Sequence, residues 1–400
     1  MELSRKCLNV NESLTLAISA KAKQMKAEGK DVIGFGAGEP DFQTPDYIME
    51  AARKALDEGF TNYTPASGTL ELREEICKKF KRDNNLDYSP DQIIVSNGAK
   101  HSLYNVFQTL LNPGDEVLIS EPYWVSYPEM VKMGDGTPVF VKTTQENNFK
   151  MKPEDLKDKI TSNTKALILN SPSNPTGTVY SKEEMEKIAE LALKYNFYVI
   201  SDEVYEYLIY DDVEHVSFAS LSDEVKDITI LINGMSKAYA MTGWRVGFAA
   251  GSKEIIDVMG NIQSHSTSNP NSIAQYASTV GLKNVEKAEE NISKMGKEFD
   301  KRRQVMVEKI NNNPLLSCTT PKGAFYIMLN IGQVIDKSYK GNKIEGSLSF
   351  ADSLLDAEQV AVVPGIAFGT DHHVRLSYEN SMENIKNGLD RINNFVEKLD

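Results

Sequence analysis

Short apolar runs alternate with helical patterns through the middle of the chain. The strand-like runs occupy residues 93–96, 116–119, 166–169, 198–200 and 228–232. Between them, apolar residues recur every three or four positions, as in the segment that carries Leu103, Val106, Phe107 and Leu110. This alternation predicts an α/β fold with a large, doubly wound, mostly parallel sheet.

The pattern changes towards the C-terminus. Residues 272–311 are helical in pattern and rich in charge, strand-like runs follow at 325–329, 360–363 and 374–376, and the last 16 residues or so form an amphipathic helix. This arrangement predicts a smaller α+β domain. We expect an N-terminal arm and helix over residues 1–30, a large domain over 31–290 and a small domain over 291–400. The arm and helix are expected to pack with the small domain and with a partner subunit.

Two helix starts carry local signals. Thr44 and Pro45 predict a cap and a first turn for a helix that runs to Gly59, with Leu56 among its inward residues. Ser181 and Glu184 have the spacing of a capping box. Both signals favour helices that cover the predicted sheet.

Composition narrows the class of protein. The 400 residues exceed the usual size of one core, and the net charge of -13 argues against nucleic acids and anionic membranes as partners. No stretch is long and apolar enough to span a bilayer, and the first residues show no apolar run typical of a secretion signal, so the cytoplasm is the expected location. The histidines and the three cysteines lack metal-ligand spacing, so no metal is expected.

Small and polar residues follow the predicted strands at 97–100, 170–177, 201–203 and 234–237. Ligands of open α/β sheets bind beyond the carboxyl ends of the strands. Each segment alone is compatible with an ordinary turn, because Gly, Asn and Ser are favoured there. Four such segments together favour a ligand site at this edge of the sheet.

Individual residues in these segments suggest a chemistry. Lys237 has apolar neighbours, which favours a neutral amine for Schiff-base formation, although a lysine that extends to solvent is the simpler alternative. Gly98 and Ala99 open a helix whose amides and dipole suit a phosphate. Arg245 could bind the same phosphate or form an ordinary surface ion pair. Trp124 could stack on a flat ligand ring or pack in the core.

Three motifs in fixed order, at 170–177, 202–205 and 236–247, resemble the class I aminotransferases of pyridoxal-phosphate (PLP) fold type I. The resemblance extends to residues 36–42, 63–68 and 374–378 and so covers nearly the whole chain. It implies a PLP-dependent enzyme that acts by a ping-pong mechanism, as a homodimer, on amino acids and 2-oxo acids.

The resemblance also implies roles for single residues. Lys237 corresponds to the lysine that binds PLP covalently and moves a proton, and Asp202 to the carboxylate beside the ring nitrogen. The other implied cofactor ligands are Asn174 and Tyr205 at the 3′ oxygen, Trp124 on the ring, and Ala99, Lys100, Ser236, Arg245 and the partner's Tyr63 at the phosphate. Arg375 corresponds to the ligand of the substrate α-carboxylate, with Asn174, Trp124 and the backbone of Gly38 beside it.

Substrate choice depends on fewer residues. Lys100 and the segment 264–270 resemble a bacterial branch of aspartate aminotransferases, in which such a lysine meets the distal carboxylate. This favours L-aspartate and 2-oxoglutarate as substrates, with oxaloacetate and L-glutamate as products. A role of Lys100 in cofactor binding alone stays open. Asn11 and Glu12 stand where prephenate-active relatives carry a basic residue before the Ser-x-Thr motif at 13–15, so prephenate activity is not expected.

Three alternatives remain, two from other classes of protein and one from the same family. The glycine-rich segment 34–38 is typical of dinucleotide loops, but it reads GxGxG rather than GxGxxG and is not followed by a helical pattern. A PLP-binding regulator would need a DNA-binding domain, for which the N-terminal arm is too short. An alanine or aromatic aminotransferase, or a cysteine-conjugate β-lyase, would share the same frame, because fold does not determine substrate.

Overall fold

The computed structural model describes residues 3–12 and 14–400. Residues 14–400 contain a seven-stranded sheet of order β2-β8-β7-β6-β5-β3-β4, in which β8 alone runs antiparallel to its neighbours. The strands are β2 (Ile93–Ser96), β3 (Glu116–Glu121), β4 (Thr137–Lys142), β5 (Thr164–Asn170), β6 (Tyr198–Asp202), β7 (Thr229–Gly234) and β8 (Gly247–Ala250). The predicted mostly parallel, doubly wound sheet is confirmed.

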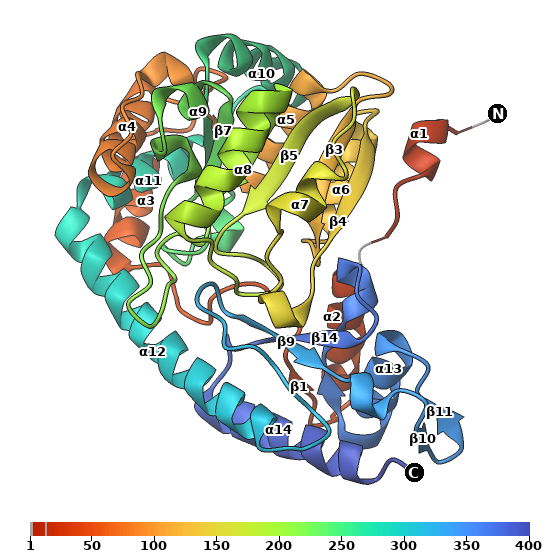
Figure 1. Ribbon diagram of the computed structural model, residues 1–400. Coiled ribbons are helices and arrows are strands. Elements are labelled where there is room, and N and C mark those ends of the chain that lie inside the picture. The colour runs from red at the N-terminus through yellow and green to blue at the C-terminus, as the bar shows by residue number, and fades with distance from the viewer. Residues whose placement is uncertain (1–2, 13) are drawn as a thin grey trace.

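Helices cover both faces of this sheet (Figure 1). Ile168 of β5 packs towards one face, and its neighbours Leu167 and Leu169 pack towards the other, because successive strand residues alternate. The first face carries α5 (Ala99–Leu110), α6 (Ser126–Met133) and α10 (Lys253–Ser266). The second carries α7 (Pro153–Lys157), α8 (Lys182–Tyr195), α9 (Asp223–Asp227), α3 (Asp46–Asp57), α4 (Leu70–Asn84) and α11 (Ser272–Lys283).

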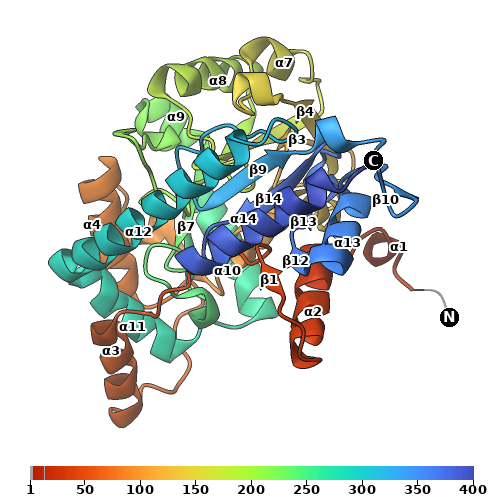
Figure 2. The same cartoon turned by 90° about the horizontal axis from the view of Figure 1, so that it is seen from below.

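A smaller unit packs beyond the carboxyl ends of the parallel strands. Within residues 14–400 it contains a three-stranded antiparallel sheet of β13 (Val363–Pro364), β14 (His373–Ser377) and β9 (Tyr326–Asn330). Seen from below, α12 (Val285–Asn311) and α14 (Met382–Glu397) lie over β9 and β14 (Figure 2). The remaining elements are α1 (Arg5–Leu8), α2 (Leu14–Ala27), α13 (Ser347–Glu358), β1 (Ile33–Gly34), β10 (Ser338–Tyr339), β11 (Asn342–Lys343) and β12 (Val360–Ala361), with short 3-10 turns between them.

The N-terminal segment belongs structurally with this smaller unit. Ala22 and Met25 of α2 pack against Leu355 and Ala361, and β1 pairs in parallel with β12. The loop after β1 then enters the space between the two sheets. The start of the chain therefore brings backbone from residue 34 onward to the edge where the parallel strands end.

Helix α12 connects the two units. Ala288, near its start, packs with the core beside α3, α4 and α11, whereas Phe299, Met306 and Ile310 pack into the core of the smaller unit. The expected helical stretch 272–311 is divided at Asn284, whose side chain donates to the Val280 carbonyl at 2.8 Å. Residue 290, the expected end of the large domain, lies inside α12. The domain boundaries stay a prediction.

Two helix details differ between prediction and structure. Thr44 does not cap α3, because its hydroxyl donates to the Ala240 carbonyl at 2.7 Å and accepts from the Trp244 ring nitrogen at 2.9 Å. Leu56 is not inward, since it is 55% exposed. The capping box of Ser181 and Glu184 on α8 is confirmed. Within residues 3–12 and 14–400, no helix has the length and apolar character needed to cross a membrane.

Candidate active site

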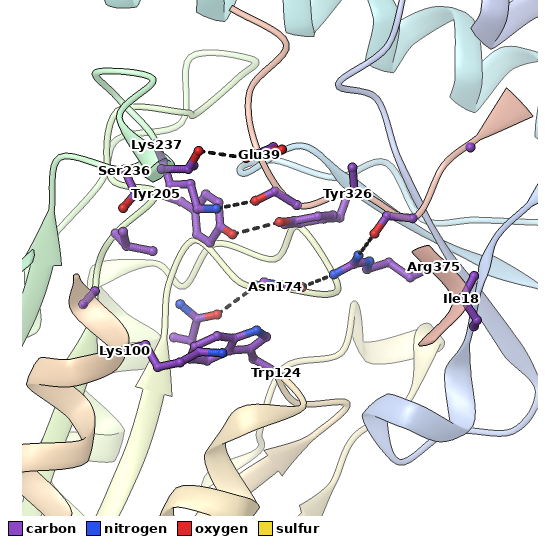
Figure 3. A pocket seen from close by; sticks show the side chains of 18 of the residues that line it. Ile18, Glu39, Lys100, Trp124, Asn174, Tyr205, Ser236, Lys237, Tyr326 and Arg375 are labelled. Atoms are coloured by element: carbon purple, nitrogen blue, oxygen red, sulfur yellow. Dashed lines mark hydrogen bonds between the residues drawn. The ribbon is translucent and has the colours of Figure 1, made fainter. Parts of the chain in front are cut away.

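A cavity of about 590 Å³ lies between the carboxyl ends of β5, β6 and β7 and the smaller sheet. Figure 3 shows side chains from both sheets converging on it. The fold brings most of the predicted site residues to its wall, namely Gly38, Ala99, Lys100, Trp124, Asn174, Asp202, Tyr205, Ser236, Lys237, Arg245 and Arg375. The turns after separate strands thus form one site, as the sheet topology requires.

Asp202 is a buried carboxyl at the end of β6. The Tyr127 hydroxyl donates to its Oδ2 at 2.7 Å, and the Val204 amide donates to its Oδ1 at 3.4 Å. Burial raises the pKa of Asp202 to about 6, and these two hydrogen bonds oppose the rise. Such a carboxylate favours a cationic partner in the cavity, where solvent cannot compensate its charge.

Lys237 lies three residues after β7. Its Nζ donates to the Gly38 carbonyl and stands 5.6 Å from the ring centroids of both Tyr205 and Phe325. Desolvation lowers the pKa of Lys237 to about 8, while the charges of Glu379 and Glu39 act in the opposite direction. A sizeable fraction of this amine is therefore neutral near pH 8, as nucleophilic or basic chemistry requires.

The first turn of α5 forms a site for an anion. Gly98 precedes it with φ of 87°, and a Cβ at Gly98 would lie 2.3 Å from Nη2 of Arg245. Only glycine therefore allows the guanidinium to lie against this helix start. Arg245 is held by a hydrogen bond from Nη1 to the Thr242 carbonyl at 2.7 Å, and Ser236 lines the cavity nearby. Free amides, a helix dipole and a guanidinium suit a phosphate group.

Arg375 of β14 reaches the cavity from the smaller sheet. Its Nη1 donates to Asn174 Oδ1 at 3.0 Å and its Nη2 to the Gly36 carbonyl at 2.9 Å. The guanidinium also stacks near the rings of Tyr326 and Phe368, with Cζ at 4.5 and 5.0 Å from their centroids. A planar fork fixed in this way is preorganised for a carboxylate.

Lys100 and Trp124 lie together at another part of the wall (Figure 3). The Lys100 Nζ is 4.9 Å from the centroid of the Trp124 ring. Burial lowers the pKa of Lys100, and the positive charge of Arg245 adds to this effect. Trp124 contacts Tyr127 edge to face at 5.2 Å. Because Tyr127 is also hydrogen-bonded to Asp202, this contact holds the Trp124 indole near the Asp202 carboxyl.

Two predicted residues do not line this cavity, namely Gly98, which precedes α5, and Tyr63. The Tyr63 side chain is 87% exposed in the single chain. Its role as a ligand from a partner subunit stays a prediction. Ser13, which belongs to the motif considered for prephenate, lies outside the described residues.

Sequence reasoning assigned no role to two tyrosines of the site. Tyr127 binds Asp202, and the Tyr326 hydroxyl lies 2.9 Å from that of Tyr205. The aromatic segment 121–128 contained a usable signal for Tyr127, because it follows a strand end. The sequence contains no comparable signal for Tyr326, because its strand belongs to the smaller sheet and only the fold brings it next to Tyr205.

The structure also gathers a set of groups with metal-ligand chemistry outside the cavity. Glu203, Glu206 and His215 each place one ligand atom within 4.8 Å of the others. Glu206 pairs with the Lys79 ammonium at 2.5 Å, and Glu203 accepts from Ser217 at 3.0 Å. Both carboxylates are therefore already engaged by protein groups. The expectation that the protein binds no metal stays a prediction.

The fold and the cavity together define a PLP-dependent aminotransferase. The family model for aminotransferase class I and II matches residues 30–392, and the chain belongs to this family. PLP is the cofactor of these enzymes, in agreement with the predicted fold type and cofactor. The anion site, the amine and the buried carboxyl described above fit the phosphate, aldehyde and ring nitrogen of PLP.

Individual relatives are similar over their whole length. The chain is 48% identical over 398 residues to the aspartate aminotransferase of Bacillus subtilis, with both chains fully covered, and 48% identical over 397 residues to that of Geobacillus stearothermophilus, with 99% of each covered. The solved aspartate aminotransferase of Thermus thermophilus with maleate has a TM-score of 0.93 at 42% identity, over 99% of this chain and 100% of that one.

Proposed function

We propose that this protein transfers the amino group of L-aspartate to 2-oxoglutarate, forming oxaloacetate and L-glutamate. The observation that carries the proposal is the convergence of Lys237, Asp202 and Arg375 on one cavity. The full-length relatives from Bacillus and Geobacillus are aspartate aminotransferases, which supports the choice of aspartate. An alanine or aromatic aminotransferase, or a cysteine-conjugate β-lyase, is the alternative that the experiment below tests.

PLP, when bound, supplies a conjugated ring over which negative charge from the substrate Cα is delocalised. Lys237 would hold the cofactor through its amine, and the same Nζ would serve as the base that moves the proton of the substrate Cα. Asp202 keeps a proton on the ring nitrogen, and Tyr127 holds the Asp202 carboxylate in place at 2.7 Å. Tyr205 and Asn174 donate to the 3′ oxygen of the ring.

The remaining residues orient the reacting molecules. Arg375 binds the α-carboxylate of the substrate, with Asn174 beside it and Gly38 closing over it through its backbone. Trp124 stacks on the ring, and Lys100 binds the distal carboxylate of aspartate or 2-oxoglutarate. Gly98, Ala99, Ser236 and Arg245 surround the phosphate. One cavity serves both half-reactions, so the kinetics are ping-pong.

The proposal includes a homodimer in the cytoplasm. Tyr63 does not line the cavity of its own chain, and its 87% exposure leaves it available to a second copy. The cavity would then be completed by the partner's Tyr63 at the phosphate. Gel filtration with light scattering tests the dimer, and Tyr63→Phe tests the contact through weaker PLP retention.

The test of the function combines trapping with a half-reaction screen. Borohydride reduction followed by peptide mapping should label Lys237, and Lys237→Ala should fold, hold PLP weakly and lose turnover. Mixing the PLP form with single amino acids should give rapid loss of the cofactor absorbance with aspartate and glutamate. A label on another lysine would refute the assignment of Lys237. Pyruvate and ammonia release from cysteine conjugates would refute the choice of reaction.

A further inference from the structure

Helix α2 presents four residues to the cavity, and the proposed reaction uses none of them. Ile18, Ala22 and Lys26 recur every four positions and Lys23 adjoins them, so the four lie on one face of the helix. Ile18 appears on the Arg375 side of the cavity in Figure 3. Ala22 also packs in an apolar cluster of the smaller unit. The two lysines are the part of this face that packing does not explain.

We call Lys23 and Lys26 the rim lysines, because they lie where the cavity opens to solvent. Both line the cavity and both are exposed, whereas Arg375 and Asp202 on its inner wall are 3% and 4% exposed. A lysine side chain can lay its stem along such a wall and keep its ammonium in water. An anion that enters at this part of the opening therefore meets two ammonium groups.

Neighbouring acids leave the charge of the rim lysines uncompensated. In the described part of the chain, no ion pair of 4.0 Å or less involves either ammonium, although Lys21 of the same helix pairs with Asp352 at 3.0 Å. Helix α2 itself contains no acid. Glu28, just beyond its end, is already engaged by Lys30 at 3.2 Å. The rim lysines therefore keep their positive charge available to a ligand.

The cavity wall is positive although the protein is acidic. The net charge of the chain is -13, so its overall field repels an anion. The residues that line the cavity show the opposite balance, with the basic side chains of Lys23, Lys26, Lys100, Lys237, Arg245 and Arg375 against the acidic ones of Glu39 and Asp202. A cleft whose wall carries mainly one sign of charge concentrates ligands of the opposite sign and raises their rate of association.

We propose that the rim lysines attract doubly charged anions, such as 2-oxoglutarate and PLP, into the cavity and thereby set which ligands it captures fastest. Their ammonium groups act through the electrostatic field at the opening, and Arg375 and Arg245 then bind the carboxylate and the phosphate. The field favours a ligand in proportion to its net charge, and 2-oxoglutarate carries two negative charges, aspartate one and alanine none. The part that concerns 2-oxoglutarate rests on the proposed function.

The experiment compares the wild type with the double variant Lys23→Gln, Lys26→Gln in the full-length holoenzyme. Glutamine removes the charges and keeps a high helix preference, so the fold should not change. Stopped-flow absorbance gives the second-order rate constant of each half-reaction, with aspartate or alanine on the PLP form and 2-oxoglutarate on the form that carries the amino group. Each is measured at an ionic strength of about 0.01 M and of about 1 M, where the Debye length is about 30 Å and about 3 Å.

The expected size follows from two charges about 10 Å from the path of the anion, in water at low salt. The second-order rate constant of the double variant should fall about threefold for aspartate and about eightfold for 2-oxoglutarate, and it should not change for alanine. The limiting rates at saturating ligand should stay the same, and every difference should vanish at about 1 M salt. Charge reversal, Lys23→Glu with Lys26→Glu, should double each effect on a logarithmic scale.

The matched control is the double variant Lys294→Gln, Lys297→Gln. These two lysines are exposed and have the same spacing along a helix, but they belong to α12, of which no residue lines the cavity. The control removes the same total charge and should leave every rate unchanged. An equal loss in the control, or a loss that persists at about 1 M salt, would show that the field of the rim does not steer the ligand.

PLP separates this inference from the choice of substrate. Its phosphate carries about two negative charges near pH 7, and its binding does not depend on which amino acid reacts. At low ionic strength, the cofactor-free rim variant should therefore bind PLP several times more slowly than the cofactor-free wild type. Slower PLP capture combined with no reaction of aspartate would refute the proposed function and support the rim. Equal rates of PLP capture at low ionic strength overturn the inference.

Discussion

The hydrogen bond from Tyr127 to Asp202 allows a prediction with a defined magnitude. Tyr127→Phe removes a donor to a buried carboxylate at 2.7 Å without changing the ring. A hydrogen bond to a charged group contributes about 1.5–3 kcal/mol, which corresponds to a pKa change of about one to two units. The pKa of Asp202, already raised by burial to about 6, should therefore rise to roughly 7 to 8 in the variant.

The assay is the affinity of the cofactor-free protein for PLP as a function of pH. An ionised Asp202 favours the protonated ring, so wild-type affinity should fall as the pH drops through about 6. In Tyr127→Phe the same fall should begin about one to two units higher. Tyr123→Phe is the control, since Tyr123 stacks on Phe140 at 4.9 Å instead. Identical midpoints for wild type and Tyr127→Phe would show that this contact does not control the charge of Asp202.

Three further substitutions test other parts of the site. The folded pKa of Asp202 is raised, so the unfolded chain releases this proton first and stability falls as the pH rises from about 4 to about 6. Asp202→Asn should therefore stabilise the cofactor-free chain by about 2–3 kcal/mol at pH 7 and by almost nothing below pH 4, in urea unfolding. Arg375→Lys loses the planar fork and should lower kcat/KM by roughly two orders of magnitude, with PLP affinity unchanged; equal kcat/KM would exclude the assigned contact. Lys100→Gln should raise KM for aspartate and glutamate but not for alanine; a uniform loss together with weaker PLP binding would assign Lys100 to the cofactor alone.

The local pattern of apolar and polar residues predicted the parallel core of the fold. It missed two strands of the large sheet. The buried runs at 166–169 and 198–200 became β5 and β6. Strands β4 and β8 were not predicted, and β8 reads Gly-Phe-Ala-Ala, whose small residues have weak strand preference. Neighbouring strands, rather than its own sequence, determine its pairing. Thr44 failed as a cap for a similar reason, because distant Ala240 and Trp244 engage its hydroxyl.

The site could be predicted where a residue follows a strand of the large sheet. Asp202 and Lys237 both do, and the rule about strand ends places them together without further information. Tyr326 lies on the other sheet, and its closeness to Tyr205 depends on packing between sheets that no local pattern encodes. Arg375 was assigned only through the family resemblance, for the same physical reason.

The long helix α12 has a structural consequence. Its 27 residues extend about 40 Å, with one end anchored in the core of the large sheet and the other in that of the small sheet. A continuous helix, and not a loop, therefore joins the two units at this crossing. The cavity that holds Arg375 opposite Asp202 thus lies between two units whose cores share one helix, although no residue of that helix lines the cavity.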